Sequence, residues 1–283
     1  MISVGQARRV HPMIRLPIAA VAIGMLAHAA TPPNPDQIIR KSIAVTKADW
    51  AQAPKYSYLE RDVESKRHSP RTSKTNRVLM IDGSPYNLVT AINDEPLSPE
   101  QKAVEQRKLE REIGKRQNES RREREKRLEK YRKENEHNHD MLQEMVDAFQ
   151  FRLAADTEVN GRACWVLDAE PKPGYEPDDH EGRVLKGMKG RLWIDKSTYQ
   201  WVKVQAEVVK PVSFYGFLAK VGPGTEFSLE QEPVGGDVWM PKTFNVRVRA
   251  SALGFFSENS DESDTYLDYQ PMPQALAELQ STK

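Results

Sequence analysis

The chain has 283 residues, which is enough for one large domain or two small ones. Its net charge of +1 excludes a general electrostatic attraction to nucleic acid or to acidic substrates. Cys164 is the single cysteine, so an internal disulfide and a cysteine-based metal cluster are excluded. The charged content of 29% against a hydrophobic content of 38% indicates that some segment lies outside a hydrophobic core.

The first 29 residues have the features of a cleaved signal peptide. Arginines precede an apolar run over residues 16–27, and Ala27-His28-Ala29 provides small residues for a cleavage site. The run is shorter than the ~20 residues of a membrane-spanning helix, and an uncleaved N-terminal anchor is the alternative. The start codon could encode Met1 or Met13. We expect a mature chain that begins near Ala30 and is periplasmic.

A helix is predicted to follow, with Asn34 as N-cap and Pro35 at its first position. Apolar residues from Ile39 to Trp50 fall on one of its faces, and it should end near residues 53–54.

Strands are predicted next. A strand over 56–64 is followed by a polar loop at 66–75. A hairpin is predicted for 77–81 and 86–92, because residues 82–85 (Asp-Gly-Ser-Pro) have the composition of a turn.

Residues 96–149 are predicted to form an inserted, charged helical arm. A capping box of Ser120 and Glu123 divides it near Asn118, and a third short helix, 141–149, should return the chain to the core. Because the middle has almost no apolar residues, we expect i,i+4 ion pairs to hold the arm and folding not to depend on it.

The rest of the chain predicts an antiparallel meander. Asn160-Gly161 is a strong hairpin signal between strands 150–159 and 162–169, and 171–182 is an acidic loop. Apolar and polar residues then alternate, which is typical of strands with one buried face, over 189–210, 226–231 and 243–250, before a last strand at 264–269.

No catalytic or phosphate-binding motif such as HExxH, GxSxG, GxxxxGK or GxGxxG occurs in the sequence. We therefore predict a protein that is not an enzyme and uses no cofactor or metal. His137, His139 and Asp140 could ligate a metal, and residues 178–181 could bind calcium, but their spacing favours solvated polar residues.

Two other patterns allow more than one interpretation. The segment 121–133 has eight basic and three acidic residues, so the arm (residues 99–139) could contact an anionic membrane surface or an envelope protein. The export signal argues against nucleic acid, and a solvated helix face is the simpler interpretation. Trp193, Trp201 and Trp239 could line a ligand site, although aromatic residues on strands more often only pack.

The most specific pattern in the chain is Gly190-Arg191-Leu192-Trp193-Ile194-Asp195 followed by Trp201-Val202-Lys203-Val204. Together with an export signal, an N-terminal helix and hairpins with an inserted helical stretch, it resembles the periplasmic lipoprotein-carrier (LolA/LolB-like) superfamily, in an outer-membrane-lipoprotein-sorting-like branch. The resemblance implies a mainly β fold with α: a curved, half-open antiparallel β-barrel that encloses helices or is capped by them. It also implies one such domain over 30–283, with 96–149 as an insertion.

We therefore expect a periplasmic binding protein that holds or carries a lipid or a lipidated protein in a concave apolar cavity. The alternative is an envelope interaction or stress-sensing module, or a scaffold, without a small-molecule ligand. Alternation assigns the cavity to one set of side chains: Leu192, Ile194, Val202, Val204, Ala206, Val208, Phe227, Leu229, Phe244, Val246 and Val248.

The link at residues 211–224 is unusually apolar for a connection between strands. Prolines and glycines at both ends provide hinges. It is expected to be either a movable lip of the cavity or a static lid, through Phe214, Tyr215, Phe217 and Leu218.

Overall fold

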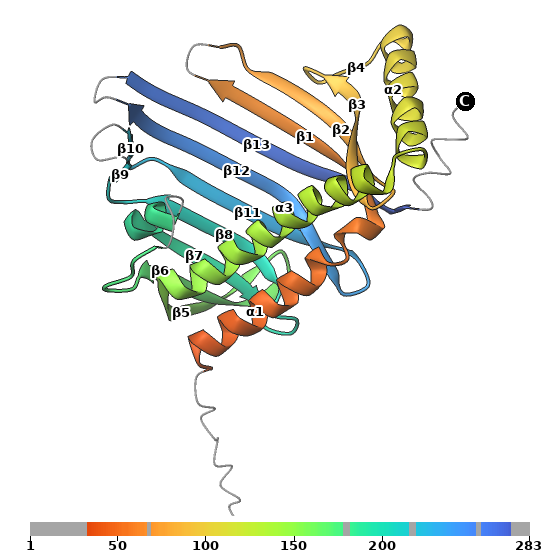
Figure 1. Cartoon of the computed structure of the whole chain (residues 1–283). Helices are drawn as coiled ribbons and strands as arrows, with labels where there is room; N and C mark the ends of the chain where they lie inside the picture. Colours follow the sequence, from red (N-terminus) through yellow and green to blue (C-terminus); the bar gives the residue numbers. More distant parts are fainter. Residues whose placement is uncertain (1–32, 67–68, 178–181, 215–218, 253–255, 273–283) are drawn as a thin grey trace, which may run out of the picture. The chain divides into compact units, whose positions relative to one another are not determined.

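The computed structural model describes residues 33–272, except for 67–68, 178–181, 215–218 and 253–255 (Figure 1). The expected signal peptide and residues 178–181 therefore lie outside the described residues. So do Tyr215, Phe217 and Leu218 of the expected lip.

One antiparallel sheet of 13 strands dominates the described residues. Its strand order is β4-β3-β2-β1-β13-β12-β11-β8-β7-β6-β5, and β9 and β10 extend it beside β12. The sheet is not closed into a barrel, because β4 and β5 form its two edges. The predicted fold class, an open antiparallel sheet with helices, is confirmed. The strands are β1 (Tyr56–Lys66), β2 (Thr72–Ile81), β3 (Ser84–Ile92), β4 (Glu95–Pro96), β5 (Phe149–Val159), β6 (Arg162–Pro171), β7 (Met188–Asp195), β8 (Trp201–Val208), β9 (Val212–Phe214), β10 (Ala219–Val221), β11 (Glu226–Gly235), β12 (Val238–Ala252) and β13 (Phe256–Pro271).

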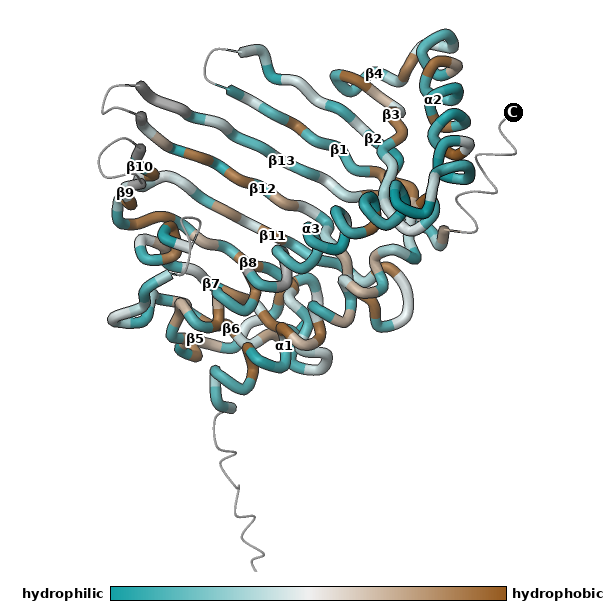
Figure 2. Tube along the Cα trace, viewed as in Figure 1, coloured by the Kyte–Doolittle hydropathy of each residue, from teal (hydrophilic) through white to brown (hydrophobic). Residues whose placement is uncertain are grey.

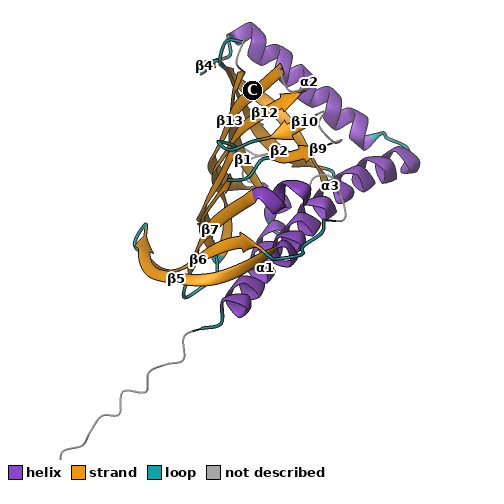
Figure 3. Ribbon diagram, turned by 90° about the vertical axis from the view of Figure 1, so that its left-hand side faces the viewer, coloured by secondary structure: helices purple, strands orange, loops and turns teal. Residues whose placement is uncertain are grey.

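The helices α1 (Pro35–Trp50) and α3 (Arg121–Ala148) lie on one side of this sheet, which we call the inner face (Figures 1 and 3). The opposite side is the outer face. The remaining helices are α2 (Pro99–Gln117) and two 3-10 turns, η1 (Ala53–Lys55) and η2 (Gly182–Gly187).

The helix starts follow the predicted caps. The Asn34 side chain accepts a hydrogen bond from the backbone N–H of Asp36 at 2.8 Å. Ser120 forms the predicted capping box at the start of α3, and Ser98 forms a second capping box at the start of α2. The division of the arm near Asn118 is thus confirmed by the structure.

The expected separate helix at 141–149 is wrong, because α3 runs without a break from Arg121 to Ala148. Its sequence contains no glycine or proline that would end the helix. Ion pairs one turn apart, such as Lys130 with Glu134 at 3.7 Å, continue through its hydrophilic middle (Figure 2).

Several strands begin earlier or end later than predicted. The expected loop at 66–75 is shorter, since β2 already begins at Thr72 and pairs with β1. The last strand is longer than 264–269: β13 starts at Phe256 although its sequence is mostly polar. Its backbone groups pair with β12 on one side and β1 on the other, so pairing decides the strand there and not hydrophobicity.

Candidate functional site

The inner face is built of rows of side chains on neighbouring strands, because directly paired residues lie on the same face. One row runs from Leu192 on β7 through Val204 on β8 and Leu229 on β11 to Phe244 on β12. The next row contains Ala206, Phe227 and Val246. Alternation in the sequence predicted both rows, and the register joins them across the sheet.

Helices cover the first part of this face. Leu192, Ile194 and Val204 are at most 2% exposed and belong to one core cluster with Ile39 of α1 and Val146 of α3. These side chains form the core under the helices. Val208, also on β8, is 1% exposed.

Two buried hydrogen bonds fix α1 over the sheet. The Trp201 indole N–H donates to Ser42 Oγ at 2.8 Å, and Gln200 Nε2 donates to Asp49 Oδ2 at 2.7 Å. Trp201 and Trp239 are 3% exposed, and Trp193 packs with Trp239 in a second cluster. These contacts show the tryptophans packing in the core.

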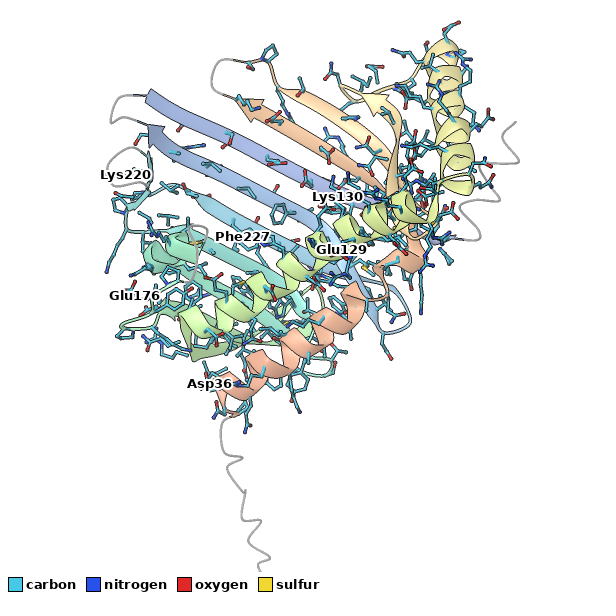
Figure 4. The ribbon with its side chains drawn as sticks, viewed as in Figure 1. Asp36, Glu129, Lys130, Glu176, Lys220 and Phe227 are labelled. Carbon is cyan, nitrogen blue, oxygen red and sulfur yellow. The ribbon has the colours of Figure 1, made fainter. Side chains whose placement is uncertain are left out.

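The second part of the inner face is only partly covered. Phe227, Leu229, Phe244, Val246 and Val248 are neither buried nor fully exposed, and we call this set the apolar stretch. The Phe227 and Phe244 rings meet edge to face with centroids 5.3 Å apart, and Figure 4 labels Phe227 on β11. Large apolar side chains that keep solvent contact beside one another are suited to an apolar ligand.

Val202 does not belong to either row. A bulge shifts the β7–β8 register, so that Trp201 pairs with Ile194, and Val202 packs with Cys164 and Trp239 in the second cluster. The expected placement of Val202 beside Val204 assumed unbroken alternation, and a bulge adds a residue that reverses it.

Beyond β12 the same face becomes acidic. Phe244 pairs with Asp264 on β13, which pairs in turn with Asp62 on β1, and Val246 pairs with Glu262. Glu60, Asp62, Glu262 and Asp264 are called the acidic end below. No local sequence pattern marks these four residues, since strands β1 and β13 come from opposite ends of the described chain.

Three carboxylates of the acidic end, those of Glu60, Asp62 and Asp264, are partly buried and repelled by neighbouring carboxylates, and both effects raise their pKa values. Burial, together with the neighbouring Asp62 and Asp264, raises the pKa of Glu60 to about 7. Burial, Asp62 and Glu262 raise the pKa of Asp264 to about 6. The Tyr266 hydroxyl partly offsets both shifts by hydrogen bonding. Lys74 acts in the opposite direction on Asp62, whose pKa is nevertheless raised, mainly by burial.

The outer face carries a groove of about 920 Å³. Its polar walls come from two rows, Asp168, Arg191, Gln205, Ser228, Asn245 and Ser263 in one and Glu170, Lys189, Glu207, Glu226, Arg247 and Asp261 in the other.

Many charges in this groove already have partners. Arg191 pairs with Asp168 at 2.7 Å and Arg247 with Glu226 at 2.9 Å. The groove therefore suits a polar surface and does not suit a hydrocarbon chain.

The remaining residues predicted from the sequence are the candidate metal ligands and the lip segment. Within the described residues, no group of three or more His, Cys, Asp or Glu could hold a metal ion. The backbone of Phe214 ends β9, which pairs with β10, so part of the expected lip segment is a short hairpin. In the same part of the chain, no helix has the length and apolar character needed to span a membrane.

No protein-family model and no curated protein matches the sequence. Three solved structures that match give low similarity. A LolA superfamily protein from Nitrosomonas europaea matches at 11% identity over 84% of this chain and 94% of that chain, with a TM-score of 0.29. A domain from Vibrio parahaemolyticus described as a putative outer membrane lipoprotein-sorting protein matches at 13% identity over 82% and 93%, with a TM-score of 0.33.

The third is the Pseudomonas aeruginosa MucA/MucB complex, matched at 11% identity over 83% of this chain and 99% of that chain, with a TM-score of 0.23. A protein of the LolA superfamily, which the sequence resembles, is thus among the matching structures. Identity this low says nothing about a ligand or a partner.

Proposed function

We propose that this protein is an exported binding protein that holds a hydrophobic ligand, such as a lipid or the acyl chain of a lipidated protein, on the apolar stretch. The observation that carries the proposal is the partial exposure of Phe227, Phe244 and Val246, side by side on the inner face. Burying such a surface against hydrocarbon is favourable by roughly 25 cal/mol per Å².

The N-terminal sequence supports export to the periplasm. Its basic start, apolar run and Ala27-His28-Ala29 are the features that signal peptidase recognises. N-terminal sequencing of the protein from the periplasmic fraction should begin at or near Ala30. A membrane-bound protein that still carries Arg15 would contradict export as a cleaved chain.

Ligand binding is tested with 1-N-phenylnaphthylamine, a neutral probe that fluoresces when it enters an apolar site. We expect saturable binding that falls about tenfold or more in Phe244→Ser, since a large apolar contact is lost. Leu267→Ser is the matched control, because Leu267 is 46% exposed and lies on β13 outside the apolar stretch. Equal binding by the parent and both variants would refute the proposal.

A second function, an envelope interaction module, is favoured by the polar groove of the outer face. Paired charges and partly exposed polar groups are typical of protein contact surfaces. Native mass spectrometry of protein purified from an envelope extract separates the two functions. A bound lipid supports the first, and a bound protein without lipid supports the second.

A further inference from the structure

In the described part of the chain, the four carboxylates of the acidic end lack the ion pairs that two acids on the outer face of β13 form. On the outer face, Asp261 pairs with Arg249 at 2.8 Å and Asp268 pairs with Arg77 at 2.5 Å. On the inner face, none of the four carboxylates of the acidic end forms an ion pair with a described residue. Two lysines offset part of the negative charge nearby: Lys66 pairs with Glu64 at 2.6 Å, and Lys74 on β2 is directly opposite Asp62 without forming an ion pair. The four carboxylates of the acidic end are left without ion-pair partners of their own among the described residues.

A buried hydrogen-bond acceptor, Asn76 Oδ1, also lies beside the acidic end. Asn76 pairs with Glu60 across β2 and β1 and is 2% exposed. Its Nδ2 donates to Asp62 Oδ2 at 3.2 Å, whereas its Oδ1 has no hydrogen-bond partner among the described residues. Asp264 Oδ1 is also buried without a partner. Unsatisfied buried acceptors cost about 1–3 kcal/mol each, so a further donor at these two oxygens would be stabilising.

We propose that the acidic end binds the positively charged, N–H-bearing head group of an amphiphile whose hydrocarbon chain lies on the apolar stretch. This inference rests on the proposed function and adds the chemical class of the ligand. An ammonium supplies both missing items, a positive charge and several hydrogen-bond donors. An anionic or purely carbonyl head group supplies neither.

The register of β12 and β13 sets the distance between the charged group and the apolar chain of the ligand. Phe244 is directly opposite Asp264, and Val246 is directly opposite Glu262, so the apolar stretch and the acidic end are one strand spacing apart. That spacing is about 4.8 Å, which matches a charged group attached directly to an alkyl chain. A small amphiphile is favoured over a basic peptide, because its longer alkyl chain can cover more of the apolar stretch than the four-carbon stem of a lysine side chain.

The test is calorimetric titration of the mature protein at pH 8, where the acidic end is ionised. The probes share a twelve-carbon chain and are used below their micelle concentrations: dodecylammonium, dodecyl maltoside and dodecanoate. We expect dodecylammonium to bind about tenfold or more tightly than dodecanoate, since each carboxylate attracts the first and repels the second. Dodecyltrimethylammonium, which has the charge but no N–H donor, should bind with intermediate affinity.

Asp62→Asn with Asp264→Asn, which removes two of the four charges, should lower the preference for the cationic probe several-fold and leave dodecyl maltoside binding within about twofold. Glu226→Gln with Asp261→Asn is the matched control, because both acids lie on the outer face and are ion-paired. This control should retain the preference. Circular dichroism establishes that each variant is folded.

The remaining outcomes distinguish failure of the cationic site from failure of the proposed function. Equal affinity for all head groups, or an undiminished preference in Asp62→Asn with Asp264→Asn, would overturn the cationic site while leaving hydrophobic binding intact. Binding of no alkyl probe at all would overturn the proposed function itself. A lysine-rich peptide that binds as tightly as dodecylammonium would overturn the assignment to a small amphiphile.

Discussion

Individual carboxyl groups give the protein a defined dependence of stability on pH. The pKa of Glu60 rises from 4.5 to about 7 on folding, and that of Asp264 rises from 3.8 to about 6. The folded protein therefore holds protons that the unfolded chain has already released between these values. The stabilisation that these groups contribute is fully present below pH ~4 and is lost as the pH rises through about 7.

We expect the free energy of unfolding, measured in urea, to be lower at pH 8 than at pH 5. In Glu60→Gln with Asp264→Asn the difference should shrink, because the groups that bind the extra protons are gone. Glu226→Gln with Asp261→Asn should leave the pH dependence unchanged. Identical pH dependence in the parent and in the first variant would show that the acidic end is ionised at pH 5.

The pKa of Asp195 is shifted in the opposite direction. Burial alone would raise its pKa, but hydrogen bonds from Ser197 and Thr198 and the nearby Arg162 lower it to about 2. The carboxylate closes the β7–β8 turn, with Ser197 N–H at 2.8 Å and Thr198 N–H at 2.9 Å from Oδ1. It thus stabilises the fold at every pH above ~4.

At the scale of single elements, the arm is more firmly docked than its sequence suggests. Leu109 of α2 is 3% exposed and packs with Leu79, Ile81 and Leu88. Arg116 is buried, and its guanidinium donates to the carbonyl oxygens of Ile81 at 2.7 Å and Ser84 at 2.8 Å. Excision of residues 101–139 should therefore destabilise the protein, contrary to the expectation from sequence.

A pair of neighbouring substitutions tests this docking. Arg116→Met leaves buried carbonyl groups without a donor and should lower the free energy of unfolding by about 2–4 kcal/mol. Lys115→Met, one residue away with a side chain that is 73% exposed, should change it by less than about 0.5 kcal/mol. Equal urea midpoints for the two variants would mean that α2 does not hold the β2–β3 hairpin.

Across the whole molecule, the inner face of the sheet has a buried part and a partly exposed part. Val204 is 2% exposed under α1, whereas Val246 on the same face is partly exposed. Alternation alone predicts equal costs for an aspartate at either position. The structure predicts unequal costs, because only Val204 is enclosed by the core cluster.

Val204→Asp should therefore lower the free energy of unfolding by more than about 3 kcal/mol, the consequence of a charge in an apolar core. Val246→Asp should cost about 1 kcal/mol, mainly from repulsion by the opposing Glu262, and should weaken binding of phenylnaphthylamine. Thermal unfolding checks the first difference and fluorescence titration the second. Similar melting temperatures would place α1 away from Val204.

The sequence by itself determined the elements whose signals are local. The Ser120 capping box, the Asn160-Gly161 hairpin and the period-two alternation of β7, β8 and β12 depend on residues a few positions apart. The expected assignment of Leu192, Val204 and Phe244 to one face followed from that alternation, and the register agrees with it. The ligand-contacting role of these side chains stays a prediction.

Only the tertiary structure decided what lies over and beside that face. The burial of Leu192 in one cluster with residues of α1 and α3, and the partial exposure of Phe244, depend on where helices from distant parts of the chain pack. Asp62 and Asp264 meet because β1 pairs with β13, a contact between strands near opposite ends of the described chain. Local sequence patterns carry no information on such pairings, since strand order depends on the free energy of the complete sheet. The sequence could therefore indicate an apolar face, whereas the four carboxylates at its end come together only in the folded sheet.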